Sequence, residues 1–470
     1  MVLLSAVLDR ASAAFGVAAR VARAIDGACR PAVQRAALAV PFAVFPLALF
    51  GLSVGFTSLV ASAHAREGPA AMHRDVPLDF LYLRDPAWHT AYNHIAPLLF
   101  TIVVAQSLLL GGLYVRVRAR PLARADVAVA CLATVGFFIA ALRVRVLEST
   151  DLYNYIVYAR LGMTHAYAPG IVVDDPALRR VTALTWGVLP PSPYGPLWQL
   201  YNGAIANAST LADAATRLRL FNAFALLTLF GGLVAARVPA AGIAILALNP
   251  YLYDQYVANA HNDLLPIVLL TLACVFARRR SWPLGVAVVL AGLVKLPFVL
   301  VGLATLGAIA SMRERIAVAV ASVTVVLGLS FALGGQAYFR ALVYASEADR
   351  HESVEHIAAV VLAIFAVGLM FLTQRRYWPG LLAVPSLRSF DYPWYLIWLV
   401  PLAYAGRSVY PIAIAFPVVG FLLSDVYVAT RLERVATYIT IAVVVAATAP
   451  PPVARAPIAV PSDALRTETP

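Results

Sequence analysis

The segment that begins at Asp151 carries the densest group of side chains that could do chemistry. It reads Asp-Leu-Tyr-Asn-Tyr over residues 151–155 and follows an apolar run that ends near residue 147. A carboxylate at the point where the chain leaves a membrane could act as a general base toward an acceptor hydroxyl. Asp151 could instead cap a helix, because Ser149, Thr150 and Asp151 all suit an N-cap position. The residues alone leave both roles open.

Three cations of the chain could bind an anion. Arg143 and Arg145 come just before Asp151, and a guanidinium group binds phosphate through paired hydrogen bonds. A salt bridge or an interface anchor is the alternative for both arginines. Lys295, the single lysine of the chain, lies between two apolar pieces. It needs a partner or an anion there, unless its ammonium group extends to the membrane surface.

Further stretches between apolar runs combine hydrogen-bonding and aromatic side chains. The His-Asn-Asp run at 261–263 is a poor set of metal ligands and a better platform for hydroxyls or phosphate. Tyr194 and Trp198 lie beside a rigid Pro-Gly turn, where they could pack on a sugar ring or a lipid, or belong to the aromatic belt of the membrane interface. Residues 391–398 form another aromatic cluster, and Pro393 breaks the helix there. The candidates for substrate binding are Tyr153, Tyr155, His165, Tyr194, Trp198, His261, Asn262, Asp263, Trp394 and Tyr395.

The elements that must position these groups are apolar runs long enough to cross a membrane. Hydrophobic residues make up 61% of the 470 residues and charged residues 13%, whereas a soluble domain carries about 25% charged residues. The mean hydropathy is +0.80. Runs of near-membrane length, such as 36–63 and 316–333, match a hydrocarbon core of about 30 Å. The sequence therefore predicts an all-α, polytopic integral membrane protein with roughly 12 transmembrane helices and short helices in its outer loops.

The arginines predict the orientation of this bundle. The net charge is +12, but the arginines form short clusters between apolar runs, as the positive-inside rule requires, which argues against a nucleic-acid partner. Clusters at 116–124, 278–280, 313–315 and 375–376 mark the cytoplasmic side. Residues 148–195 then form the main outer loop. The composition, rich in Ala, Val, Leu and Arg, suggests a bacterial chain, so we expect the cytoplasmic (inner) membrane, with the chemistry facing the periplasm or cell exterior.

The chain divides into three predicted regions. Residues 1–35 are rich in alanine, with arginines at loosely helical spacing, and predict a cytoplasmic amphipathic helix on anionic lipid. Residues 36–450 form a single transmembrane domain. Within it, residues 196–212 are polar enough for a half-inserted or surface helix, and residues 282–293 and 296–310 predict a tight helix pair that meets at Lys295. Residues 451–470 predict a disordered cytoplasmic tail.

Three cysteines, at positions 29, 131 and 274, show no metal-site spacing. The sequence therefore predicts no metal, no cofactor and no disulfide framework.

The order of these motifs resembles the GT-C superfamily of membrane glycosyltransferases, and especially the bacterial polyprenol-phosphate-mannose-dependent mannosyltransferases. Members carry an Asp-x-Tyr-x-Tyr pattern in an outer loop, which residues 151–155 match. A Gly-x-Asn-Pro-Tyr-like turn of the family is replaced here by Tyr-Ala-Pro-Gly after His165. Four more steps follow in order: Tyr-Gly-Pro-Leu at 194–197, Asn-Pro…His-Asn-Asp at 249–263, Val-Lys-x-Pro at 294–297 and Pro-Trp-Tyr at 393–395.

The resemblance implies a transferase that moves a sugar, first of all mannose, from a polyprenyl-phosphate donor to a glycan or lipid acceptor of the cell envelope. Asp151 would be the general base, and Arg143, Arg145 and Lys295 would bind the donor phosphate without a metal. In many superfamily members the catalytic aspartate lies in the first outer loop, which leaves three alternatives to Asp151, namely Asp75, Asp79 and Asp85.

Two other classes of protein explain part of the pattern. A transporter or flippase for a lipid-linked saccharide predicts inverted repeats and ionisable residues at the centre of the membrane, and the sequence shows no convincing repeat. A structural scaffold of an envelope complex explains the spans but not the ordered motifs.

Overall fold

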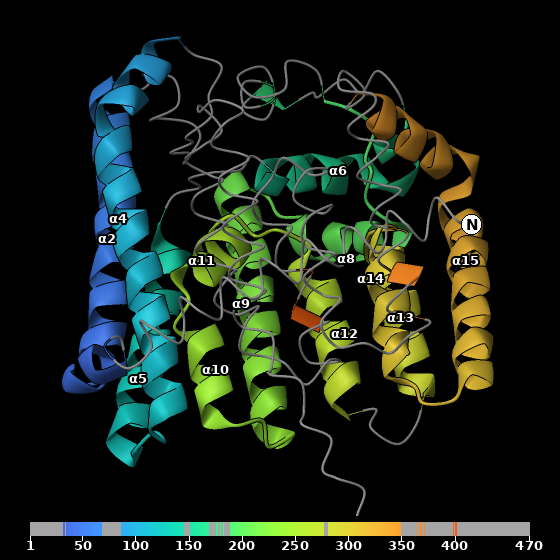
Figure 1. Cartoon of the computed structure of the whole chain (residues 1–470). Coiled ribbons are helices and arrows are strands. Elements are labelled where there is room, and N and C mark those ends of the chain that lie inside the picture. Colours follow the sequence, from blue (N-terminus) through green and yellow to red (C-terminus); the bar gives the residue numbers. More distant parts are fainter. Residues whose placement is uncertain are drawn as a thin grey trace, which may run out of the picture.

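The computed structural model describes residues 32, 34–67, 86–144, 151–168, 189–276 and 281–348, with single positions 175, 176, 179 and 182 and short pieces at 364, 367–368, 371, 398 and 400–401. Within these residues every regular element is a helix and no strand occurs (Figure 1). Several sequence-based predictions lie outside the described residues: most of the N-terminal segment, the tail at 451–470, and the side chains of Asp75, Asp79, Asp85, Arg145, Trp394 and Tyr395.

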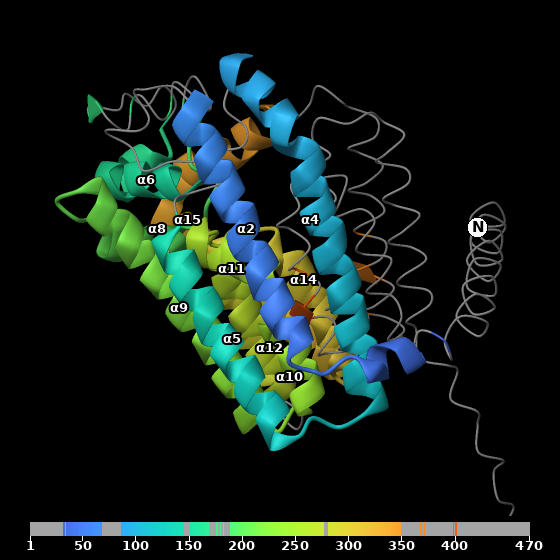
Figure 2. The ribbon, with the colours of Figure 1, turned by 90° about the vertical axis from the view of Figure 1, so that its left-hand side faces the viewer.

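Long upright helices form the body of the protein. They are α2 (Val44–Glu67), α4 (Pro86–Ala119), α5 (Arg124–Arg143), α9 (Leu211–Ala235) and α15 (Met312–Ala348). In the described part of the chain, four stretches are long and apolar enough to cross a membrane: Val44–Ser62, Arg124–Arg143, Leu211–Ala235 and Met312–Ala345. The membrane fold is thus supported, whereas the predicted count of roughly 12 spans is not confirmed. Figure 2 shows α2 running beside α4 and α5, against which it packs.

The surface of α9 shows what these spans face. Leu220, Phe224 and Leu227 recur at helical spacing and are exposed, while Leu218 and Asn222 on another face are buried. A stripe of large apolar side chains on the outside of a helix is costly in water but normal against lipid tails. The exposed stripe of α9 is thus suited to contact with lipid tails, and its buried face looks inward.

The apolar segment 240–256 is not one continuous helix. It is divided into α10 (Ala240–Ala247), α11 (Pro250–Tyr253) and the π-helical turn η1 (Asp254–Ala258). Pro250 has no N–H and begins α11, and the Asn249 side chain caps that helix by accepting from Tyr251 N at 3.1 Å. The proline and the capping asparagine end one helix and start another, which an apolar average over the window does not reveal.

A second break separates α13 (Trp282–Val294) from α14 (Phe298–Thr305), which continues into the 3₁₀ turn η2 (Leu306–Ala308). These helices pack against each other, which confirms the predicted pair that meets at Lys295. Gly302 permits the approach, since a Cβ there would lie 2.8 Å from the Val288 side chain. The helix α12 (Leu264–Phe276) packs beside them.

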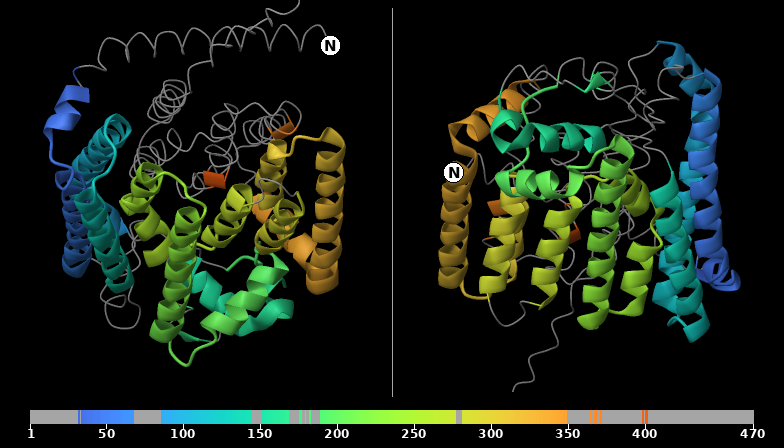
Figure 3. Two further views of the ribbon diagram at one scale, coloured as in Figure 1. Left: turned by 90° about the horizontal axis from the view of Figure 1, so that it is seen from below. Right: turned by 180° about the vertical axis from the view of Figure 1, so that it is seen from behind.

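Two further helices, α6 (Asp151–Ala166) and α8 (Pro196–Ala206), lie across one end of the upright helices (Figures 1 and 3). The position of α8 agrees with the surface helix predicted within 196–212. Residues 152–159 of α6 are all buried, and the helix kinks at Gly162, where φ is 71°. The non-helical segments that precede α12 and α14 lie next to the layer formed by α6 and α8.

Candidate active site

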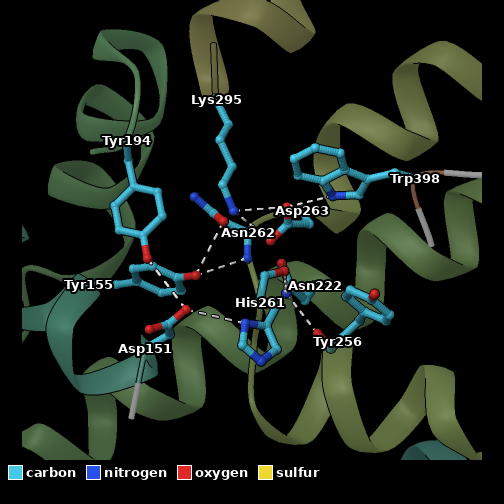
Figure 4. Close-up of polar contacts among 10 residues, drawn as sticks. All are labelled: Asp151, Tyr155, Tyr194, Asn222, Tyr256, His261, Asn262, Asp263, Lys295 and Trp398. Atoms are coloured by element: carbon cyan, nitrogen blue, oxygen red, sulfur yellow. Dashed lines mark hydrogen bonds and ion pairs between the residues drawn. The ribbon is translucent and has the colours of Figure 1, made fainter. Parts of the chain in front are cut away.

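Residues at helix ends and turns from four parts of the chain lie close together (Figure 4). Asp151 is the first residue of α6, and Tyr194 precedes α8. The segment 261–263 joins η1 to α12, and Lys295 separates α13 from α14. Each turn contributes polar side chains where a helix begins or ends, which is where backbone groups lack helical partners. Together they form a compact polar cluster, shown with its contacts in Figure 4.

The Asp151 carboxylate is held by two neighbours through the same oxygen. His261 Nδ1 lies 3.4 Å from Asp151 Oδ2. The Tyr194 hydroxyl donates to that oxygen, also at 3.4 Å. The Asp151 side chain keeps 16% of its surface exposed, whereas the His261 side chain is fully buried. Of this pair, Asp151 is therefore the group that a substrate can reach.

The charge of Asp151 is stabilised by these neighbours. Burial acts to raise the pKa of Asp151, but the hydrogen bond and charge of His261, the charge of Lys295 and the hydrogen bond from Tyr194 together bring the pKa below its ordinary value. This helix lies outside the candidate membrane spans. Asp151 is therefore ionised at neutral pH, which is the form that accepts a proton.

The His-Asn-Asp turn is fixed from two sides. Asn222 of α9 donates through Nδ2 to the carbonyl of Tyr256 at 2.7 Å and to that of His261 at 2.9 Å. The Tyr155 hydroxyl donates to Asn262 Oδ1 at 3.2 Å and accepts from Asn262 N at 3.3 Å. These contacts join α6, α9 and the turn, so the position of His261 depends on all three.

Lys295 forms a buried ion pair with Asp263. Its Nζ donates to the two carboxylate oxygens of Asp263 at 3.0 and 3.2 Å. Trp398 Nε1 donates to the same carboxylate at 2.8 Å. The ammonium also lies 5.7 Å from the ring centroid of Tyr194 and 5.6 Å from that of Trp398, within cation–π range. Extension of Lys295 to the membrane surface, the alternative left open by the sequence, is therefore wrong.

The Tyr-Gly-Pro step brings Tyr194 to this ammonium group. Gly195 N donates to Val294 O at 2.8 Å, so the two chain segments touch through their backbones. A Cβ at position 195 would overlap the carbonyl oxygen of Leu293. Only glycine permits this approach, and the residues on either side of the contact, Tyr194 and Lys295, are placed side by side by it.

The structure brings together seven residues that the sequence analysis singled out: Asp151, Tyr155, Tyr194, His261, Asn262, Asp263 and Lys295. Trp198 is buried against the Tyr155 ring, with centroids 5.2 Å apart, and Tyr153 is buried in α6. Arg143 and His165 are exposed, and within the described residues no side-chain hydrogen bond or ion pair joins either of them to the cluster. Among the described residues no group of histidines, cysteines and carboxylates is arranged to hold a metal ion.

Sequence reasoning missed several supporting residues. Asn222 holds the His261 turn, and Asn202 of α8 donates to the Tyr155 carbonyl at 2.6 Å. Arg219 donates to the carbonyls of Val144 and Ala258, each at 2.7 Å, and ties α5 to η1. A usable signal existed for Asn222, because an amide inside an apolar span is costly unless it has partners. Trp398 lay in the aromatic run at 391–398 but carried no feature that distinguished it from its neighbours.

Residues 52–313 match the family model described as the alpha-(1->6)-mannopyranosyltransferase N-terminal domain of the MptA_B family. The match covers more than half of the chain and contains every described residue of the cluster except Trp398. The protein is therefore a GT-C-like membrane glycosyltransferase that transfers mannose, as the motif order predicts. It belongs to the MptA_B family. No curated protein and no solved structure matches the sequence.

Proposed function

We propose that this mannosyltransferase takes mannose from a polyprenyl-phosphate donor and forms an α-(1→6) linkage to a glycan or lipid acceptor of the cell envelope. The observation that carries the proposal is the setting of Asp151. An ionised, partly exposed carboxylate begins a helix that lies across the ends of the spans. An acceptor hydroxyl can reach it there, while a lipid-linked donor stays in the bilayer.

In the proposed reaction Asp151 is the general base. The acceptor hydroxyl gives its proton to the Asp151 carboxylate as its oxygen bonds to the anomeric carbon of mannose. The bond from that carbon to the donor phosphate oxygen breaks, and its electron pair leaves with the lipid phosphate. Phosphate departs without strong acid assistance, so a second carboxylate acting as acid is not required.

The donor phosphate is proposed to lie against Arg143, Arg145 and Lys295. Lys295 already bonds to Asp263, but an ammonium group has three N–H donors and can share its charge between a carboxylate and a phosphate. Of the remaining candidates, His165, Tyr194, Trp394 and Tyr395 would contact the sugar and the acceptor by stacking and hydrogen bonding. The fully buried candidates would hold the walls of the site in place; they are Tyr153, Tyr155, Trp198, His261, Asn262 and Asp263.

We further propose that the cluster faces the periplasm or exterior of a bacterial inner membrane. The support is the separation of charge along the helices. α5 begins at Arg124 and ends near the cluster, where Arg219 holds Val144. Ser281, which precedes α13, bonds to Glu314 beside Arg313 and Arg315, and Lys295 follows the other end of this helix. The described arginine clusters that predict the cytoplasmic side therefore lie a helix length from Asp151.

The test is Asp151→Asn in protein reconstituted into lipid vesicles with radiolabelled polyprenyl-phosphate mannose and an α-(1→6)-linked mannan oligosaccharide. We expect transfer to fall by about 10²- to 10⁴-fold, because the amide cannot accept the proton. Binding of the donor should be retained. The matched control is Asp213→Asn, at an exposed carboxylate in the first turn of α9.

Unchanged transfer by Asp151→Asn would overturn the proposal. In that case the same substitution at Asp75, Asp79 and Asp85 shows whether the base lies in the first outer loop.

A further inference from the structure

We infer that His261 is a positioning residue of the transfer reaction, which orients the Asp151 carboxylate without touching substrate. The inference rests on the proposed role of Asp151 as base. His261 Nδ1 lies 3.4 Å from Asp151 Oδ2, and the imidazole is fully buried. A ring with no exposed surface cannot meet an acceptor, so its chemistry reaches the reaction only through Asp151.

The backbone just before His261 has two unusual conformations. Ala260, the residue before it, has φ +52°, which a residue with a Cβ seldom adopts. The preceding turn η1 is π-helical, and insertions of this kind recur at functional sites. A strained residue persists only where its surroundings over-determine it. Here the strain and the π-turn together aim the imidazole at Asp151.

The surroundings that hold this turn come from another helix. Asn222 of α9 donates to the carbonyls of Tyr256 and His261 and so links the two ends of the turn. His261 N also donates to the carbonyl of Gln255 at 3.3 Å. The backbone of His261 is therefore held in place by contacts that do not involve Asp151. The rigid partner is His261, and Asp151 is the group that it holds.

The close contact of His261 Nδ1 with Asp151 has two effects. It fixes Oδ2, which the Tyr194 hydroxyl also contacts. It also favours the ionised carboxylate over the neutral acid. The titratable and charged groups that face Asp151 are His261 before α12, Tyr194 before α8, Lys295 after α13, and Tyr155 and Tyr158 on its own helix. Of these five groups, Tyr155 and Tyr158 keep their protons at neutral pH, because burial raises the pKa of both hydroxyls.

The experiment compares His261→Ala, His261→Gln and the parent in the vesicle assay over about pH 4 to pH 8. For His261→Ala we expect kcat to fall by about 10- to 100-fold, because a misplaced base loses alignment with the acceptor. The KM for polyprenyl-phosphate mannose should stay within about threefold, since the imidazole does not contact the donor. The acidic limb of kcat/KM should move to higher pH, because the pKa of Asp151 rises without its partner.

His261→Gln serves as the conservative variant, since its amide can donate to Asp151 without carrying charge. We expect it to recover part of kcat relative to His261→Ala. His94→Ala, at an exposed histidine of α4, is the matched control and should behave as the parent. Thermal unfolding separates loss of fold from loss of positioning. If His261→Ala does not fold, His261→Gln alone carries the test.

The outcomes separate the inference from the proposed function. Loss of transfer in Asp151→Asn, together with parental kcat and pH profile in folded His261→Ala, overturns the positioning role and leaves the base role intact. Where only His261→Gln folds, a parental pH profile in that variant overturns it, because the amide carries no charge to favour the ionised Asp151 carboxylate. Full transfer in Asp151→Asn overturns the base role itself.

Discussion

At the scale of single residues, the ion pair of Lys295 and Asp263 joins two charged side chains that are both largely buried. The Asp263 side chain is 1% exposed and the Lys295 side chain 10%. Removing one member of such a buried pair leaves an unpaired charge and costs about 3–5 kcal/mol, whereas replacing both is far less harmful. A double substitution can therefore distinguish support of the fold from contact with the donor.

We predict that Lys295→Met lowers both stability and donor affinity, and that adding Asp263→Asn restores stability alone. The asparagine oxygen still accepts from Trp398 and leaves no buried charge. The donor phosphate, however, still lacks its cation. Thermal unfolding measures the first effect, and the KM for polyprenyl-phosphate mannose measures the second. Full recovery of that KM in the double variant would show that Lys295 serves only to balance Asp263.

Residue types in the sequence predicted which residues belong to the cluster, but not which of them contact each other. The His-Asn-Asp run and the lone lysine stood out because polar groups are costly between apolar runs. The contacts of Asp263 with Lys295 and of His261 with Asp151 depend on how the fold places the starts of α6 and α12 and the end of α13. No local pattern contains that information, so the sequence required a partner or an anion for Lys295 but did not identify Asp263 as that partner.

At the scale of elements, the contact between the start of α8 and the end of α13 sets the spacing of the cluster. Gly195 lies directly on the backbone of Leu293 and Val294. We predict that Gly195→Ala costs about 1–3 kcal/mol of stability, because the added methyl forces the two segments apart. Transfer should fall as well, since Tyr194 and Lys295 flank the contact.

Gly203→Ala is the matched control on the same helix. A Cβ there meets nothing within 4 Å, and alanine favours a helix interior over glycine by about 1 kcal/mol. Thermal unfolding should therefore show equal or higher stability for Gly203→Ala. Equal stability of both alanine variants would mean that the α8–α13 contact can relax at no cost.

Uninterrupted spans were predicted well, and so was the break at Lys295, but the break at 240–256 was not. The apolar runs at 36–63 and 316–333 predicted membrane spans, and α2 and α15 occupy these regions. Long apolar runs decide such helices by themselves. At 240–256 the composition is equally apolar, yet Pro250 and the Asn249 cap divide the segment. Apolar content predicts which segments lie in the membrane, whereas a proline or a capping side chain decides whether such a segment is one continuous helix.

At the scale of the whole molecule, the proposed orientation predicts which loops are accessible from each side of the membrane. Ser209, between α8 and α9, is exposed near the cluster end, and Ser311, before α15, is exposed at the opposite end. In a chain whose native cysteines are replaced, we expect Ser209→Cys to react with a membrane-impermeant maleimide in intact spheroplasts. Ser311→Cys should react only after permeabilisation. The reverse pattern would place the cluster on the cytoplasmic side.

The short helices α12 and α13 have a consequence for how the chain enters a membrane during synthesis. Each has 13 residues, or about 20 Å of helix, which falls short of a hydrocarbon core of about 30 Å. Neither provides a complete insertion signal by itself. We expect the translocon to release them into lipid as a packed hairpin with α14, so that the polar cluster forms during biogenesis and not after it.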